Sequence, residues 1–242
     1  QYLEEPQQAS PAVAAILEKP FRGERLNEAE IVTLFQARGP DMGAVAQAAD
    51  RLRRQVKGDE VTYVVNRNIN YTNVCYFKCQ FCAFSKGKLT ENLRGDPYVV
   101  PLDEIKRRVA EAWDRGATEV CMQGGIHPAY TGQTYLDICR AVKEAQPHMH
   151  VHAFSPLEVF QGAETLGRPL KDYLYDLKEA GLDTLPGTAA ELLDDEVRTI
   201  LCPDKLTTQL WLDGMRAAHD VGFKTTATVM YGHVERPEHW AR

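Results

Sequence analysis

Residues 103–122 read DEIKRRVAEAWDRGATEVCM, and this stretch indicates the class of fold. Ile105, Val109 and Trp113 recur at the spacing of one helix face. Gly116 ends that pattern, and the run TEVCM follows at once. Glycine commonly closes a helix, and a short apolar run after it is typical of a buried strand. The stretch therefore predicts a helix that leads directly into a strand, the repeating element of α/β folds.

The same succession of helix, glycine and strand recurs along the chain. A helical pattern near 170–180 is closed by Gly181 and leads into LDTL. Another near 207–221 is closed by Gly222 and leads into FKTTATVM. A further helix precedes HMHVHAF, and VTYVV at 61–65 opens the series. Five strands that alternate with helices predict a parallel sheet.

The pattern favours a barrel over a dinucleotide-binding sheet, because no Gly-x-Gly-x-x-Gly follows the first strand. A closed (β/α) barrel of the TIM type usually takes about 250 residues. Residues 60–242 hold only five units, so we expect a partial or truncated barrel that lacks its C-terminal part. Residues 1–59 are predicted to form an N-terminal helical extension, in which Asn27 and Glu30 match a capping box and Gly58 ends a second helix.

Composition narrows the class of protein. The chain has 242 residues, of which 44% are hydrophobic and 26% charged, and its formal net charge is −6. An acidic balance argues against a nucleic-acid partner, which needs a basic face. No apolar run approaches the roughly 18 residues of a membrane span, and no signal-peptide pattern is visible at the N-terminus. We expect a cytoplasmic protein that binds neither nucleic acid nor membrane.

Three of the six cysteines crowd into eight residues after the first predicted strand. Cys75, Cys79 and Cys82 form Cys-x-x-x-Cys-x-x-Cys, with Phe81 directly before the last cysteine. Three thiolates can hold three irons of a 4Fe–4S cluster and leave the fourth iron open. Structural zinc needs four closed ligands, and no further Cys or His follows until Cys121. An iron–sulfur cluster is therefore favoured over zinc and over three incidental thiols.

A three-cysteine loop after the first barrel strand resembles the radical S-adenosylmethionine (SAM) enzymes. The resemblance implies that Cys75, Cys79 and Cys82 hold a 4Fe–4S cluster whose open iron chelates SAM. It also implies that reduction cleaves SAM to methionine and a 5′-deoxyadenosyl radical, which takes a hydrogen from the substrate. An electron donor such as flavodoxin or ferredoxin would supply the electron.

Four further motifs resemble one branch of that superfamily, the tyrosine-dependent half of the FO synthase family, which makes the deazaflavin FO. They are MQGGIHP at 122–128, HVHAFSPLEV at 150–159, LDTLPGTAAELLDDEVR at 182–198 and TTATVMYGHVE at 225–235. The resemblance implies cleavage of the Cα–Cβ bond of L-tyrosine. The 4-hydroxybenzyl fragment then joins C5 of 5-amino-6-(D-ribitylamino)uracil, leaving 2-iminoacetate. A second radical SAM subunit, or the other half of one bifunctional chain, would close the deazaflavin ring.

Two alternatives stay open on the sequence. Futalosine-pathway enzymes of menaquinone synthesis resemble the chain in the cysteine loop and the Gly-Gly turn. The cyclic dehypoxanthine futalosine synthases among them, however, have a motif that resembles PGGGAE where this chain has PGTAAE at 186–191. An iron–sulfur electron carrier without SAM is the alternative of another class. The Gly-Gly turn and the long β/α repeat argue against a carrier, which needs only a small cage.

Candidate cofactor contacts lie at the ends of the predicted strands. Gly124 and Gly125 end the second strand, and paired glycines serve either an ordinary tight turn or a close approach of backbone to a ligand. Beside the cysteine loop we favour the ligand, SAM. Ser155, with Glu158, and Glu191 follow strands three and four, at the catalytic face of a barrel, and are candidates for SAM as well. Phe81 belongs to the same expected cofactor site.

Candidate substrate contacts come from alternation along two strands. Asn66, Asn68 and Asn70 share one parity of the first strand, and His150 and His152 share one parity of the third. Alternate residues face the lumen of a barrel, and the intervening apolar residues should face the helices. We expect this amide and imidazole row to line the lumen, where it would either contact a polar substrate or pair internally. We assign no general acid or base.

Overall fold

The computed structural model describes residues 8–85 and 96–242. The chain forms two compact units, Val64–Met230 and a second unit made of Gln1–Tyr63 with Tyr231–Arg242. The final residues of the chain therefore belong to the same unit as the N-terminal helices.

The larger unit is built on one parallel sheet whose five strands lie in chain order. The strands are β1 (Asn66–Asn68), β2 (Glu119–Met122), β3 (His150–Ala153), β4 (Thr184–Leu185) and β5 (Lys224–Thr225). A doubly wound dinucleotide fold reverses its strand order, whereas a barrel wall does not. The order therefore confirms the predicted α/β fold, a partial TIM-type barrel.

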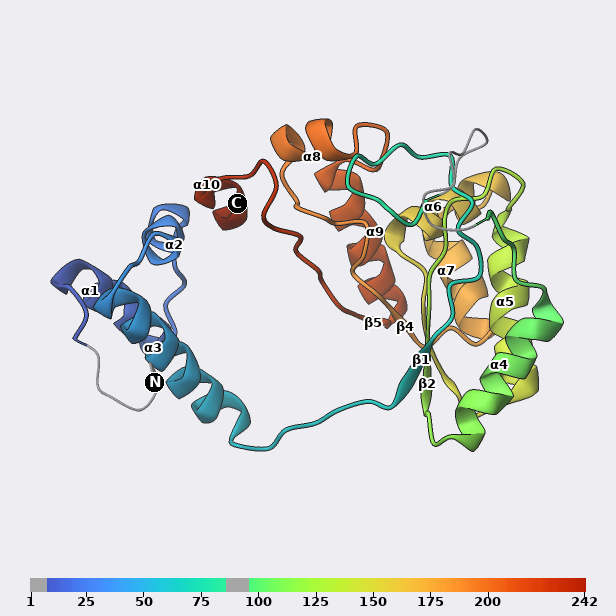
Figure 1. Cartoon of the computed structure of the whole chain (residues 1–242), viewed down its shortest axis with the longest axis horizontal. Helices are drawn as coiled ribbons and strands as arrows, with labels where there is room; N and C mark the ends of the chain where they lie inside the picture. The colour runs from blue at the N-terminus through green and yellow to red at the C-terminus, as the bar shows by residue number, and fades with distance from the viewer. Residues whose placement is uncertain (1–7, 86–95) are drawn as a thin grey trace. The chain divides into compact units, whose positions relative to one another are not determined.

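Helices alternate with these strands and lie along the sheet (Figure 1). They are α4 (Leu102–Asp114), α5 (Gly132–Ala145), α6 (Pro156–Thr165), α7 (Leu170–Glu179), α8 (Asp195–Leu201) and α9 (Thr208–Val221). Gly116, Gly181 and Gly222 all adopt positive φ just after α4, α7 and α9. This is the left-handed conformation that glycine provides at helix ends, so the predicted helix–glycine–strand units are confirmed.

The two faces of the sheet differ in chemistry. Val120, Met122, Val151 and Ala153 are fully buried in one core with Ile105 and Val109 of α4, Ile138 of α5 and Leu174 and Leu177 of α7. The alternate residues of β2 and β3 are only partly buried and are mostly polar. Helices thus cover the apolar face, and the polar parity lies on the other side, as the alternation predicts.

The first strand is shorter than predicted. VTYVV at 61–65 lies outside β1, and Val61 and Tyr63 are 87% and 86% exposed. Within this run the amide of Thr118 donates to the carbonyl of Val65 at 2.9 Å. β-Branched residues favour a strand only where they pack on a neighbouring surface, and 61–63 have none.

Two helices of the larger unit, α6 and α8, were not predicted from the sequence. The Ser155 hydroxyl and the Glu158 carboxylate form a reciprocal capping box at the start of α6, a signature readable as Ser-x-x-Glu. Asp194 caps α8 by accepting from the amides of Glu196 and Val197. Both capping residues can be read in the sequence. The apolar residues that follow each cap are too few to show the repeat of a helix.

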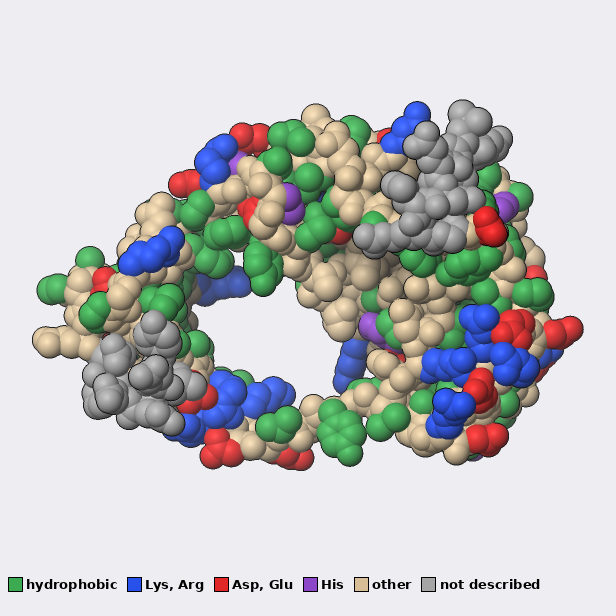
Figure 2. All heavy atoms as spheres, in the orientation of Figure 1, with side chains coloured by type: hydrophobic (Ala, Val, Ile, Leu, Met, Phe, Trp, Pro, Cys, Tyr) green, Lys and Arg blue, Asp and Glu red, His purple; other side chains and the backbone are tan. Residues whose placement is uncertain are grey.

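The exposed side of α4 carries charges of both signs (Figure 2). Glu104 pairs with Arg107 and Arg108, and Glu111 pairs with Arg115 and with Arg67 of β1. Spacings of three and four residues bring such pairs together on a helix. The contact with Glu111 also shows that Arg67 points to the helix side of the sheet, so its neighbours Asn66 and Asn68 point away.

The smaller unit is helical. It contains α1 (Pro11–Glu18), the 3-10 turn η1 (Pro20–Arg22), α2 (Glu28–Phe35), α3 (Pro40–Lys57) and α10 (Pro237–Ala241). The capping box of Asn27 and Glu30 is present, and Gly58 follows α3 at positive φ. Trp240 of α10 packs on Phe35 of α2, with ring centroids 5.0 Å apart. No helix among the described residues is both long and apolar enough to cross a membrane.

We predict that Leu177→Ala lowers the free energy of unfolding by about 2–5 kcal/mol, because it opens a cavity in a packed core. Leu177 is fully buried, whereas Leu210, at the start of α9, is 43% exposed. Leu210→Ala is therefore the matched control, expected within about 0.5 kcal/mol of the parent. Urea unfolding followed by circular dichroism measures both. Equal losses in the two variants would contradict the assigned core.

Candidate functional site

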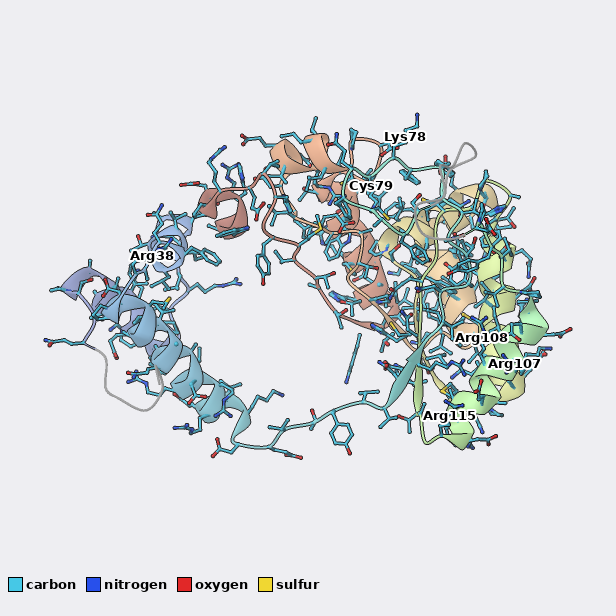
Figure 3. The ribbon with its side chains drawn as sticks, in the orientation of Figure 1. Arg38, Lys78, Cys79, Arg107, Arg108 and Arg115 are labelled. Atoms are coloured by element: carbon cyan, nitrogen blue, oxygen red, sulfur yellow. The ribbon has the colours of Figure 1, made fainter. Side chains whose placement is uncertain are left out.

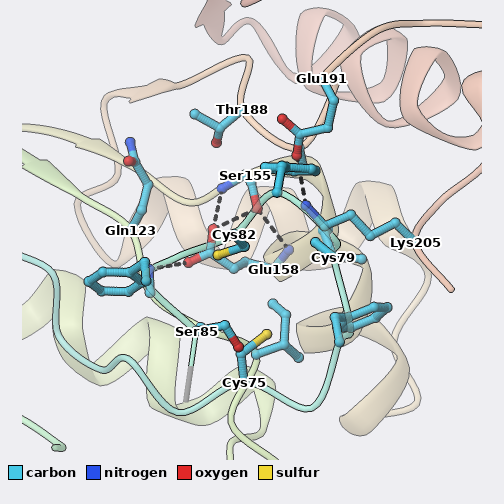
Figure 4. Close-up of a pocket in the computed structure, with 18 residues that line it drawn as sticks. Cys75, Cys79, Cys82, Ser85, Gln123, Ser155, Glu158, Thr188, Glu191 and Lys205 are labelled. Atoms are coloured by element: carbon cyan, nitrogen blue, oxygen red, sulfur yellow. Dashed lines mark hydrogen bonds and ion pairs between the residues drawn. The ribbon is translucent and has the colours of Figure 1, made fainter. Parts of the chain in front are cut away.

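The three clustered cysteines line one cavity at the carboxyl ends of the strands. Cys75, Cys79 and Cys82 are free thiols of intermediate burial, and the cavity measures about 390 Å³. The same cavity is lined by five other residues predicted for the cofactor site: Phe81, Gly124, Gly125, Ser155 and Glu191. Figure 4 shows these groups arranged around a common space, with the Cys75 and Cys82 sulfurs turned into it. The structure thus brings together all residues expected at the cofactor.

The cysteine loop is held by main-chain hydrogen bonds to the segment after β2 and to the end of α8. The amide of Gly125 donates to the Thr72 carbonyl at 2.9 Å, and the amide of Tyr76 donates to the Ile126 carbonyl at 3.2 Å. On its other side, the amide of Gln80 donates to the Leu201 carbonyl at 2.9 Å. These three hydrogen bonds hold the loop in place through protein contacts alone.

Gly124 and Gly125 each have a packing reason to be glycine. A Cβ on Gly124 would lie 2.4 Å from the Tyr71 ring, and one on Gly125 would lie 2.3 Å from the Val74 carbonyl oxygen. The second clash is with backbone and has no side chain to rotate away. A side chain at Gly125 would therefore displace the start of the cysteine loop near Cys75. The close approach that the sequence suggested involves the chain itself, and the turn also borders the cavity.

Glu158 is buried at the centre of this arrangement. Its Oε1 accepts from the Tyr71 hydroxyl and, at 3.1 Å, from the Gly124 amide. Its Oε2 accepts from the amide and the hydroxyl of Ser155, each at 2.6 Å. Burial raises the pKa of Glu158, and the surrounding donors oppose that shift. Four donors match the acceptor capacity of one carboxylate.

Ser155 serves two purposes in the geometry. Its hydroxyl donates to Glu158 and accepts from the Glu158 amide as the cap of α6. The residue before it, Phe154, has a φ of +64°, a left-handed backbone that is costly for an aromatic residue. The strained turn places Ser155 on the cavity wall.

The loops on either side of α8 contribute an ion pair that the sequence did not reveal. Lys205 donates to Glu191 at 2.7 Å, and both side chains are largely buried, at 12% and 15% exposure. The Lys205 Nζ also lies 5.5 Å from the centroid of Phe81. Burial raises the pKa of the Cys79 thiol to about 11, and the neighbouring Lys205 ammonium acts in the opposite direction. Lys205 follows Glu191 by fourteen residues with no periodic pattern between them, so only the fold reveals the pair.

The predicted substrate residues lie outside this cavity, and those that belong to strands lie on the polar face of the sheet, whereas Asn70 follows β1. Asn66 donates to Glu119 at 3.2 Å, and His150 and His152 each share a hydrogen bond with the Thr184 hydroxyl, at 2.8 and 2.7 Å. A second cavity of about 290 Å³ is lined by Glu119, His150, His152 and Thr184 together with residues of β5. Asn66, Asn68 and Asn70 line neither cavity.

The donor set fits an iron–sulfur cluster better than zinc. The three cysteines are the only Cys or His among the described residues that line the larger cavity. A closed zinc site would need a fourth such ligand. A 4Fe–4S cluster accepts three thiolates and leaves one iron facing open space, which the cavity provides.

Comparison with known proteins agrees with this chemistry. Residues 69–242 match the Radical SAM superfamily. The chain is 50% identical over 89% of its length to a Streptomyces avermitilis protein named FO synthase. It is 47% identical over 91% of its length to a Methanocaldococcus jannaschii protein named 5-amino-6-(D-ribitylamino)uracil–L-tyrosine 4-hydroxyphenyl transferase. The chain spans 25% and 61% of the lengths of these two relatives.

Solved structures show the same fold at low identity. The FeFe-hydrogenase maturase of Carboxydothermus hydrogenoformans superposes with a TM-score of 0.68 at 18% identity, over 94% of this chain and 50% of the other. Methylornithine synthase gives 0.64 at 18% identity, over 87% and 57%. The chain belongs to the radical SAM superfamily. Its cofactors are accordingly a 4Fe–4S cluster and SAM, as the sequence predicted.

We predict that Glu158→Gln lowers the free energy of unfolding by about 1–3 kcal/mol. The amide nitrogen cannot accept a hydrogen bond, so buried donors of Ser155 or of Tyr71 and Gly124 lose their partner. Glu164, exposed on the same helix, supplies the matched control Glu164→Gln, expected within about 0.5 kcal/mol. Chemical denaturation of both variants measures the difference. A Glu158→Gln protein as stable as the control would refute the carboxylate's structural role.

Proposed function

We propose that this chain is the catalytic part of a radical SAM transferase in deazaflavin FO synthesis. It would join the 4-hydroxybenzyl group of L-tyrosine to 5-amino-6-(D-ribitylamino)uracil. The observation that carries the proposal is identity near 50% along nine-tenths of the chain to proteins bearing the names FO synthase and 4-hydroxyphenyl transferase. The two names describe one synthesis, and the second names both substrates.

In this proposal Cys75, Cys79 and Cys82 hold the cluster. The bound cluster and SAM would supply the radical that starts the reaction. The protein would position these cofactors and the substrate and shield them from water. Two observations support the ligand set. The three thiols border one cavity, and the loop that carries them is tied to the ends of β2 and α8.

The SAM contacts are proposed among the other residues that line that cavity. Gly124 and Gly125 would let their backbone approach the amino-acid end of SAM, and Ser155 and Glu191 would lie along its length. Phe81 would pack beside the cluster. These five residues line the same cavity as the cysteines, which supports the proposal. Each also has a structural role or a protein partner, so cofactor binding must coexist with those contacts.

The substrate contacts are proposed on the polar face of the sheet, at Asn66, Asn68, Asn70, His150 and His152. The row is supported by the register of the strands: Asn66 aligns with Glu119 and His150, and Asn68 aligns with Cys121 and His152. Amide and imidazole groups suit a polar substrate such as a ribityl-uracil, because each can donate or accept hydrogen bonds.

Partners and location follow from the same proposal. A second radical SAM subunit or domain of FO synthase would consume the adduct, and a small electron carrier such as flavodoxin or ferredoxin would reduce the cluster. We propose a cytoplasmic location, because free cysteines and an oxygen-sensitive cluster both require a reducing compartment.

We predict that Cys75→Ala, Cys79→Ala and Cys82→Ala each abolish assembly of the cluster, because each thiolate holds one iron. Cys121→Ala, Cys139→Ala and Cys202→Ala should retain the iron content of the parent. Iron and acid-labile sulfide after anaerobic reconstitution measure the effect. Loss of the cluster in any of the second three variants would show that the ligand set is wrongly assigned.

We predict that the reconstituted full-length protein, with reductant and SAM, consumes tyrosine only when 5-amino-6-(D-ribitylamino)uracil is present, or far faster when it is. Label in the tyrosine ring should enter the adduct, whereas carboxylate label should remain in the two-carbon fragment. Mass spectrometry measures both products alongside 5′-deoxyadenosine. Cyclisation of dehypoxanthine futalosine without a hydroxybenzyl adduct would favour the menaquinone alternative. A cluster spectrum that does not change on adding SAM would favour an electron carrier.

A further inference from the structure

Lys205 is a buried cation beside the cysteine loop. Among the described residues that line the larger cavity it is the only Lys or Arg, and the two charged groups that share the lining are Glu158 and Glu191. Figure 4 shows its ammonium reaching Glu191 and lying next to Cys79. A buried ammonium is costly unless it is paired, so this position is a specific feature of the site.

Arg198 fixes the pair. Its side chain is almost fully buried, and its guanidinium donates to the Ala190 carbonyl and, at 2.5 Å, to the Leu206 carbonyl. These two carbonyls belong to the residues adjoining Glu191 and Lys205. One planar cation therefore closes the loop from 190 to 206 and holds the ion pair in place. The pair is not a chance contact between two flexible surface side chains, which would contribute little.

The cysteine loop is hydrogen-bonded to the same segment, residues 190–206. Residues on both sides of Cys79 are bound to it: the Gln80 amide donates to the Leu201 carbonyl at 2.9 Å, and the Lys78 amide donates to the Asp204 carboxylate at 3.1 Å. These two hydrogen bonds hold the loop around Cys79 against the segment that carries Lys205. The positive charge of Lys205 acts directly on the Cys79 thiol.

We propose that Lys205 is an electrostatic residue that holds a fixed positive charge against the Cys79 side of the cluster and thereby favours its reduced state. The inference rests on the proposed ligand set. Reduction adds one negative charge to the cluster, and a cation in a poorly solvated site stabilises that charge more than one in water does. Charge and hydrogen bonds near the thiolates are known determinants of cluster potential. Glu191 anchors the lysine and partly opposes its effect.

The test is a potentiometric titration of the reconstituted full-length protein without SAM, followed by electron paramagnetic resonance of the reduced cluster. In Lys205→Met the ratio of reduced to oxidised cluster at a fixed potential should fall about tenfold, a shift of ~59 mV for one electron. Lys205→Arg keeps the charge and should keep most of the parent ratio. Glu191→Gln removes the opposing charge, so its ratio should rise. Opposite signs for Lys205→Met and Glu191→Gln would not arise from general damage to the site.

Lys78→Met is the matched control. Lys78 adjoins Cys79 in sequence, but its side chain is exposed and extends away from the loop (Figure 3). Solvent screens its charge, so the ratio should stay at the parent value. An unmoved ratio in Lys205→Met, or shifts of the same sign in Lys205→Met and Glu191→Gln, would overturn the inference. If Lys205→Met takes up no iron, a Glu191→Gln ratio that does not rise overturns it. A parent protein that assembles no cluster would instead overturn the proposed function itself.

Discussion

The buried carboxylate of Glu158 is the contact on which the site depends. Parallel strands end at one edge of the sheet, but nothing in the sheet ladder fixes the loops that follow them. Glu158 accepts from Tyr71 after β1, Gly124 after β2 and Ser155 after β3. One acceptor group therefore sets the relative positions of three segments: the start of the cysteine loop at Tyr71, the Gly-Gly turn and α6. Because the carboxylate is fully buried, losing any donor leaves charge without compensation in a poorly solvated place.

Backbone strain gathers at the same edge. Phe154, Ala189 and Glu191 are the non-glycine residues with positive φ among those the structure describes, and all three follow β3 or β4. Such conformations cost about 1–3 kcal/mol each and persist only where surrounding contacts enforce them. Arg198 supplies such contacts for the β4 loop by donating to the Ala190 carbonyl, between the two strained residues, and to the Leu206 carbonyl beyond α8. Contacts with the surrounding structure thus maintain the strained backbone. That backbone turns Ser155 and Glu191 toward the cavity.

Local patterns predicted much of this molecule and long-range contacts the rest. Gly116, Gly181 and Gly222 marked helix ends because a positive φ is a local requirement, and the cysteine spacing marked the metal site because the ligands come from one loop. VTYVV wrongly predicted a strand at 61–65. β-Branched residues favour strands where they pack against a neighbouring surface, and these side chains are largely exposed. The pairing of Lys205 with Glu191 could not be predicted, because it depends on how Arg198 folds the chain between them.

The polar face of the sheet differs from the usual interior of a barrel. Interiors of TIM-type barrels are usually filled by layers of branched apolar side chains. Here the corresponding parity carries Asn66, Glu119, His150, His152 and Thr184. Asn66 donates to Glu119, and both histidines share hydrogen bonds with Thr184. A packed apolar core would leave such groups unpaired, at a cost of several kcal/mol in total. Their mutual pairing satisfies these groups within the sheet, and the proposed ribityl-uracil, rich in hydroxyl and amide groups, could exchange those bonds for its own at little net cost.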